Sequence, residues 1–171
     1  MAGQRPGQVL QFICLALLAE EPASGYDIRR KIVASELHPF VPHGQATVYA
    51  ALKALEKDGK VISERRAGCG RPDQKLFRLL PSGATELAAG VLDPDDEGTI
   101  PILLRFQALL PEGTVREVVS HQLDRTRRSL ATDPGHYPDA ALADWRARAS
   151  SSYQRWRTQT LSELLEILQR D

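Results

Sequence analysis

Residues 44–57, GQATVYAALKALEK, carry two different kinds of side chain on the two sides of a predicted helix. At about 100° per residue, Val48, Leu52 and Leu55 form one apolar stripe, as the core-facing side of a helix does. The opposite side carries small and basic residues, namely Ala46, Ala50, Lys53 and Lys57. Methyl and ammonium groups together let a large, negatively charged surface come close, which is the chemistry of DNA binding, although a solvated helix face can have the same composition.

Two further helices are expected before this one. Residues 8–19 are apolar on nearly every side, which is typical of a helix buried on several faces, and a Glu-Glu-Pro sequence ends it. Residues 24–37 are predicted to form the next helix. Ser24 begins it, and Ile28 and Ile32 form its inward stripe.

A hairpin is expected after the third helix. Asp58-Gly59 ends that helix, and the spacing of apolar residues then changes from a period of 3.6 to a period of 2. We therefore expect strands over residues 61–66 and 74–80, joined by a turn-rich tip at 67–73. Three helices and a hairpin in this order, within about 80 residues, predict a winged helix-turn-helix domain.

In such a domain the third helix enters the major groove, so the small and basic side of residues 44–57 would face base edges. Gln45 and Thr47 can read bases, Tyr49 can reach a phosphate, and the basic hairpin can reach the backbone or the minor groove. The predicted DNA-binding residues are Ser24, Tyr26, Gln45, Thr47, Tyr49, Lys53, Arg65, Arg66, Arg71 and Lys75. Any one of them is more often an ordinary surface residue, but their gathering on one helix face and one hairpin favours DNA.

Three spaced motifs lie on these elements. Gly25-Tyr26-Asp27 opens the second helix, Tyr-x-x-Leu-x-x-Leu-Glu-x-x-Gly covers residues 49–59, and Gly70-Arg71-Pro72 lies in the hairpin tip. In these motifs the sequence resembles the PadR-like transcriptional regulators over residues 8–90. The resemblance implies a repressor that a small, often aromatic, molecule releases from DNA. Two positions depart from the family pattern: Leu76-Phe77 replaces Tyr-Tyr, and Leu80 replaces a threonine before the fourth helix, where leucine is a poor N-cap.

The second half of the chain differs from the first in charge. Residues 1–80 hold 12 Lys and Arg against 8 Asp and Glu, whereas residues 81–171 hold 10 against 14. A basic half and an acidic half indicate two roles, of which only the first faces a polyanion. In the acidic half we expect a short helix over 100–110 and a second over 111–131, with Val115, Val118, Val119 and Leu123 inward.

A helix of about 30 residues, some 45 Å long, is predicted over residues 139–171. Its apolar side is more than a small domain can cover, so we expect it to pack on a second copy. The predicted dimer interface comprises Trp145, Ala149, Ser152, Trp156, Leu164 and Leu168. Trp145, Tyr153 and Trp156 have a second interpretation as the wall of a pocket for a flat effector, with dimer core as the simpler one.

Other kinds of site find little support in the sequence. Cys14 and Cys69 form neither a C-x-x-C site nor a disulfide framework. The acidic run that begins at Asp93 mimics half of a calcium loop, but Leu104 occupies the twelfth position, where a glutamate is needed. We therefore expect no metal, no cofactor and no catalytic residues. No apolar run is long enough to cross a bilayer and no secretory signal is evident, so we expect a cytoplasmic protein.

The sequence thus predicts a mainly α-helical protein with a small β-hairpin wing. Residues 1–90 are expected to form the winged helix-turn-helix DNA-binding domain, 91–98 an acidic linker, and 99–171 a helical domain for dimerisation and effector binding. The expected function is a non-enzymatic, dimeric repressor that binds an inverted repeat. Two other hypotheses stay open: a protein-interaction adaptor that no longer binds DNA, and a small-molecule carrier or enzyme built on the helical half.

Overall fold

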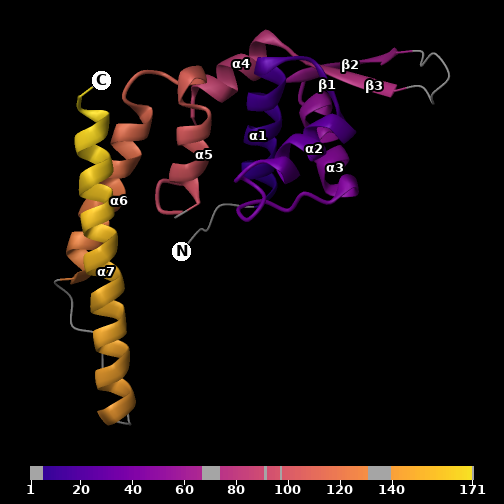
Figure 1. Ribbon diagram of the computed structural model, residues 1–171. Coiled ribbons are helices and arrows are strands. Elements are labelled where there is room, and N and C mark those ends of the chain that lie inside the picture. The colour runs from indigo at the N-terminus through magenta and orange to yellow at the C-terminus, as the bar shows by residue number, and fades with distance from the viewer. Residues whose placement is uncertain (1–5, 67–73, 91, 97, 131–139, 171) are drawn as a thin grey trace. The chain divides into compact units, whose positions relative to one another are not determined.

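The computed structural model describes residues 6–66, 74–90, 92–96, 98–130 and 140–170 (Figure 1). The fold is mainly helical with one small sheet, as predicted. The elements are α1 (Pro6–Glu20), β1 (Ala23–Ser24), α2 (Gly25–Ala34), α3 (Gln45–Lys57), β2 (Val61–Arg66), β3 (Gln74–Leu79), α4 (Pro81–Ala88), α5 (Thr99–Arg105), the 3-10 helix η1 (Gln107–Leu109), α6 (Thr114–Leu130) and α7 (Ala140–Leu168). The chain divides into two compact units, Met1–Glu112 and Gly113–Asp171.

The division between the units falls later than the linker expected at residues 91–98. The helix α5 and the η1 turn belong to the first unit. Phe106, which follows α5, is buried, and its ring stands edge-on to that of Phe12 in α1, with centroids 6.4 Å apart. Arg105 at the end of α5 pairs with Glu20 of α1 at 3.0 Å. These contacts make α5 part of the packing around α1.

The core of the first unit is built around α1. This helix is buried on several sides, as its continuous apolar sequence predicts, with Leu10, Ile13 and Leu15 all at most 2% exposed. The inward stripes of the next two helices are confirmed, since Ile28 and Ile32 of α2 and the predicted stripe of α3 are buried. Such burial stabilises the fold by about 1.5–3 kcal/mol for each large side chain.

The sheet has three strands rather than the two of a simple hairpin, in the order β1-β3-β2. The pair β2 and β3 is antiparallel and places Val61 opposite Leu79 and Arg65 opposite Lys75. The unpredicted strand β1 pairs with β3 through only two residues, Ala23 and Ser24. A strand of two residues has no period that a sequence can show, which explains why it was missed.

The turn between α3 and β2 is set by Gly59. Its φ of +66° suits glycine best, because a Cβ is unfavourable there. Its amide donates to the Glu56 carbonyl at 3.1 Å, and the Lys60 amide donates to the Leu55 carbonyl at 2.8 Å. This pair of bonds is a Schellman motif, which ends α3 and directs the chain into β2 at Val61.

The start of α4 agrees with the expectation drawn from Leu80. This residue is the N-cap and makes no side-chain capping bond, while Pro81 occupies the first turn. Proline suits that position because its missing N–H would have had no partner within the helix. The boundary is therefore set by proline and by packing, without a capping hydroxyl.

The second unit consists of α6 and α7, which pack side by side (Figure 1). Val115, Val119 and Leu123 of α6 are buried together with Leu161 of α7. Val118 was expected inward as well but is only half-buried, because it lies beside the contact stripe. Within the described part of the chain, no helix is long and apolar enough to cross a membrane.

Candidate nucleic-acid interface

The helix α3 presents an exposed polar face opposite its buried stripe. Val48 and Leu52 are 0% exposed. The residues exposed on the other side are Gln45, Ala46, Thr47, Ala50, Lys53 and Lys57. Because the small alanines stand between longer polar groups, the backbone of this face can come close to a partner surface. The groups that the sequence assigned to base reading are therefore accessible.

The first turn of α3 has the polarity of an anion-binding end. Its N-cap is Gly44, which makes no side-chain capping bond, and its first turn contains no acidic residue. The early N–H groups of a helix lack partners within the helix and carry partial positive charge. Gln45 and Thr47 lie at this end and are exposed.

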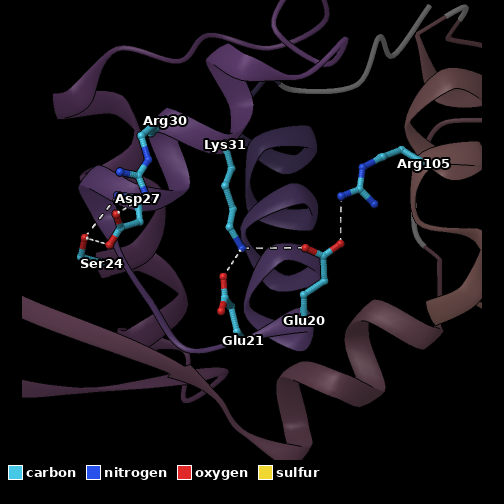
Figure 2. A network of polar contacts seen from close by, with 7 residues as sticks. All are labelled: Glu20, Glu21, Ser24, Asp27, Arg30, Lys31 and Arg105. Carbon is cyan, nitrogen blue, oxygen red and sulfur yellow. Dashed lines mark hydrogen bonds and ion pairs between the residues drawn. The ribbon is translucent and has the colours of Figure 1, made fainter.

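The start of the helix α2 is capped by a buried serine. Figure 2 shows Ser24 and Asp27 at its start, where the Ser24 hydroxyl donates to Asp27 Oδ2 at 2.7 Å and accepts from the Asp27 amide at 3.2 Å. Ser24 is 2% exposed. This placement differs from its expected role in contacting DNA, because its hydroxyl is used as a helix cap. Tyr26, two residues later, is exposed.

Tyr49 joins two of the three sequence motifs in space. Its ring packs over Gly25, so closely that a Cβ built on Gly25 would lie 2.8 Å from Tyr49 Cζ. Glycine at the start of α2 therefore lets α2 and α3 approach each other. Arg29 adds a bond from α2 to the turn before α3, donating from Nε to the His43 carbonyl at 3.2 Å. Tyr49 is half-buried, so its ring has a packing role besides the predicted phosphate contact.

A polar network ties α1 to α2 and α5 behind this surface. In Figure 2, Lys31 of α2 reaches Glu21 at 2.7 Å and Glu20 at 3.9 Å, and Arg105 reaches the other oxygen of Glu20. Asp27 also pairs with Arg30 at 3.1 Å within α2. These side chains are partly exposed, so each pair adds only about 0–1 kcal/mol of stability.

The wing presents its basic residues in different ways. Arg65 is exposed. Arg66 ends β2 opposite Gln74, and only its backbone is described. Arg71 lies outside the described residues. Lys75 is paired within the chain, since its Nζ stands 2.8 Å from Glu56 Oε2, although its side chain is partly exposed.

Glu56 is a site residue that sequence reasoning missed. Its carboxylate accepts hydrogen bonds from Lys75 and from the Ser63 hydroxyl, and these bonds, Lys75 first, hold its pKa below the ordinary value. The family-type motif at 49–59 contains this glutamate, but only the fold brings it to both strands of the wing.

The candidate residues of α7 lie in the second unit. Trp156 is 61% exposed and Tyr153 43% exposed, with ring centroids 6.0 Å apart. Ser152 is exposed, and Leu164 and Leu168 are half-buried. Trp145 and Ala149 belong to α7, but their side chains lie outside the described part. Among the described members of the predicted interface, Trp156 is thus the large apolar side chain that remains exposed.

Cys14 is not a reactive group of the described surface. Cys14 is buried in α1, and burial raises the pKa of its thiol to about 12, so it stays protonated. Cys69 lies outside the described residues. Among the side chains that the structure describes, no group of three or more His, Cys, Asp and Glu residues could hold a metal ion.

Comparisons with known proteins point to one family. Residues 14–89 match the sequence profile of the transcriptional regulator PadR-like family. A probable transcriptional regulator of Mycobacterium tuberculosis is 30% identical over 80 residues, which are 47% of this chain and 42% of that protein. The matched segment thus spans less than half the length of this relative.

Two solved structures of Bacillus subtilis PadR are similar over most of this chain. The complex with operator DNA has 19% identity and a TM-score of 0.45, over 94% of this chain and 99% of the other. The complex with p-coumaric acid has 19% identity and a TM-score of 0.42, over 99% and 100%. The family profile covers the same helices and wing as the three sequence motifs, so residues 14–89 of this chain are similar to the PadR-like family of transcriptional regulators.

Proposed function

We propose that this chain binds double-stranded DNA through α3 and the wing, and that it represses transcription as a homodimer on an inverted repeat. The observation that carries the proposal is the two-sided character of α3. Its apolar stripe is buried, while Gln45 and Thr47 are exposed at its positively polarised N-terminal end. Lys53 is exposed farther along the same helix, among small alanines. An adaptor that had lost DNA binding would have no need of this combination.

DNA binding is tested by selection from a library of random duplexes of about 30 base pairs, long enough for two half-sites one helical turn apart. We expect an inverted repeat to be recovered. Failure to retain any duplex, or retention without sequence preference, would favour the adaptor hypothesis. A promoter carrying the recovered repeat, fused to a reporter, should be less active when the protein is present, and higher activity would indicate an activator.

Thr47→Ala is expected to change which sequences bind. Loss of a base contact should cost about 1–3 kcal/mol at one base position and leave other positions unchanged. Lys53→Ala is the matched variant on the same face. It should weaken binding to all sequences equally and reduce the slope of log affinity against log salt by about 0.9 for each subunit of the dimer. If Thr47→Ala lost the same amount of affinity for every sequence variant of the recovered repeat, that result would argue against base reading by this residue.

The dimer is proposed to form through α7. Support comes from Trp156 and Tyr153, which lie exposed on α7, whereas Leu161 of the same helix is buried where α7 packs on α6. Large exposed apolar surfaces are typical of interfaces. A two-fold dimer would place two copies of α3 at half-sites about 34 Å apart.

A small aromatic effector is the second part of the proposal. The motivating observation is again the exposed pair of rings, which lies in the second unit, where no DNA contact was predicted. A flat ligand stacking on an indole gains apolar burial and about 0.5–1.5 kcal/mol from the aromatic contact. To release DNA it must also prefer the non-binding state by several kcal/mol.

The effector is tested by titrating a panel of phenolic and other flat aromatic compounds against tryptophan fluorescence and DNA release. We expect an active compound to quench the wild-type chain and to lose its effect on Trp156→Leu. In that variant the second tryptophan, Trp145, still reports on the long helix. DNA release from the variant at an unchanged ligand concentration would leave Trp156 as part of the dimer only.

A further inference from the structure

We propose that Glu56 is a positioning residue that holds the wing against α3, and that Lys75 serves this internal contact and does not bind phosphate. The inference rests on the proposed function, since the position of the wing matters only if the wing meets DNA. It also assigns different roles to two basic residues, Lys75 and Arg65, that the sequence placed in one set.

The Glu56 carboxylate connects three elements. It stands near the end of α3, and its two oxygens accept from two different strands: Oε1 from the Ser63 hydroxyl of β2, and Oε2 from the Lys75 ammonium of β3 at 2.8 Å. Ser63 lies opposite Phe77 in the sheet, and Phe77 is two residues from Lys75 along β3. Because side chains alternate along a strand, Ser63, Phe77 and Lys75 share one face of the sheet.

One further contact keeps Lys75 in this place. Its Nζ lies 5.1 Å from the centroid of the Phe77 ring, and Phe77 is fully buried. The side chains of Glu56 and Lys75 are 32% and 40% exposed, so the pair is partly shielded from water. By contrast Glu64 and Arg78, on the other face of the same hairpin, stand 3.5 Å apart with more than half of each side chain exposed. The Glu56 pair is therefore the better ordered of the two.

The same arrangement determines the charge that the wing presents. Arg65 lies directly opposite Lys75, and like charges in such a cross-strand pair repel each other. Glu56 neutralises Lys75 and so relieves this repulsion. Arg65 is exposed, and among the described residues no carboxylate forms an ion pair with it. Arg65 is thus the cation of this face that remains for phosphate.

The first test uses the free protein, so it does not depend on DNA. In Glu56→Gln we expect the amides of β2 and β3 to exchange hydrogen about five- to tenfold faster, because a charged hydrogen bond between helix and wing is lost. Glu64→Gln is the matched control on the same hairpin and should leave these rates nearly unchanged. Equal rates in Glu56→Gln and the wild type would overturn the role of Glu56.

The pH dependence separates the carboxylate from simple packing. The bonds from Lys75 and Ser63 place the pKa of Glu56 in the folded chain below its ordinary value of 4.5. A group with a lowered folded pKa stabilises the fold above its unfolded pKa, and this contribution is lost as pH falls through the folded value. The difference in exchange between wild type and Glu56→Gln should therefore be complete at neutral pH and should shrink below pH 4.5. A difference independent of pH would mean that the carboxylate is not the cause.

The roles of the two cations are compared on the duplex recovered by selection. Arg65→Ala should reduce the slope of log affinity against log salt by about 0.9 for each subunit of the dimer, whereas Lys75→Met should weaken binding without changing the slope. The reversed pair, Glu56→Lys with Lys75→Glu, should bind the duplex with an affinity within about threefold of that of the wild type. Lys75→Glu alone should fail to bind it. Equal slope changes in Arg65→Ala and Lys75→Met, or no rescue by the reversed pair, would place Lys75 on DNA. If the wild type retains no duplex, the proposed function fails, while the exchange and pH tests still decide the role of Glu56.

Discussion

Gly83→Ala is expected to lower the free energy of unfolding by about 3 kcal/mol, at the upper end of what overpacking of a core costs. Gly83 lies in the first turn of α4 and is buried. A Cβ at this position would overlap the carbonyl oxygen of Lys60 and would stand 2.8 Å from Leu79 Cδ1. The Lys60 carbonyl cannot move away freely, because it accepts a hydrogen bond from the Leu80 amide at 2.9 Å. The turn between α3 and β2 would therefore be pushed away from α4.

The measurement for Gly83→Ala is chemical denaturation of variant and wild type. Their free energies of unfolding are compared provided that both depend on denaturant concentration with the same slope. Gly7→Ala is the matched control, since Gly7 also lies in the first turn of a helix but has nothing within 4 Å of the added Cβ. It should be neutral or stabilising by up to about 1 kcal/mol. A loss of less than about 1 kcal/mol in Gly83→Ala would show that α4 can shift without cost.

Trp156→Glu is expected to convert the proposed dimer into a monomer and to reduce affinity for the inverted repeat by about 100-fold or more. The indole is 61% exposed in the single chain, so its removal takes little from the core of the α6 and α7 unit. In a two-fold interface the new carboxylate would instead be buried twice, near its own symmetry mate, without a partner. Binding to a single half-site should stay as in the wild type, because α3 and the wing are unchanged.

Sedimentation and DNA titration on one-site and two-site duplexes measure the effect of Trp156→Glu. Arg155→Ala provides a control one residue earlier, about 100° around the helix, where the side chain is also exposed. It should remain a dimer. A Trp156→Glu chain that sediments as a dimer and binds the two-site duplex normally would place the interface elsewhere.

Much of the local structure could be predicted from the sequence because the signals are local. The apolar stripe of α3 repeats at helical spacing, and the strand over residues 61–66 was placed at its observed bounds, because Gly59 and the change of period stand next to it. The exposure of Gln45, Thr47 and Lys53 also follows from that stripe, since residues opposite a buried side face outward. Whether a residue is buried or exposed within its own helix or strand can therefore be predicted from its neighbours in the sequence.

Only the tertiary structure decided which partners the polar groups have within the chain. Ser24 and Lys75 both have the chemistry of a phosphate contact, yet Ser24 caps α2 beside the short strand β1, and Lys75 pairs with a carboxylate 19 residues away. Gly25 is needed because the Tyr49 ring comes to rest on it, and α5 joins the first unit because Phe106 meets Phe12. A side chain takes the partner that the packed chain brings within hydrogen-bond distance, and that proximity depends on closing loops between distant elements, for which periodicity and composition carry no signal.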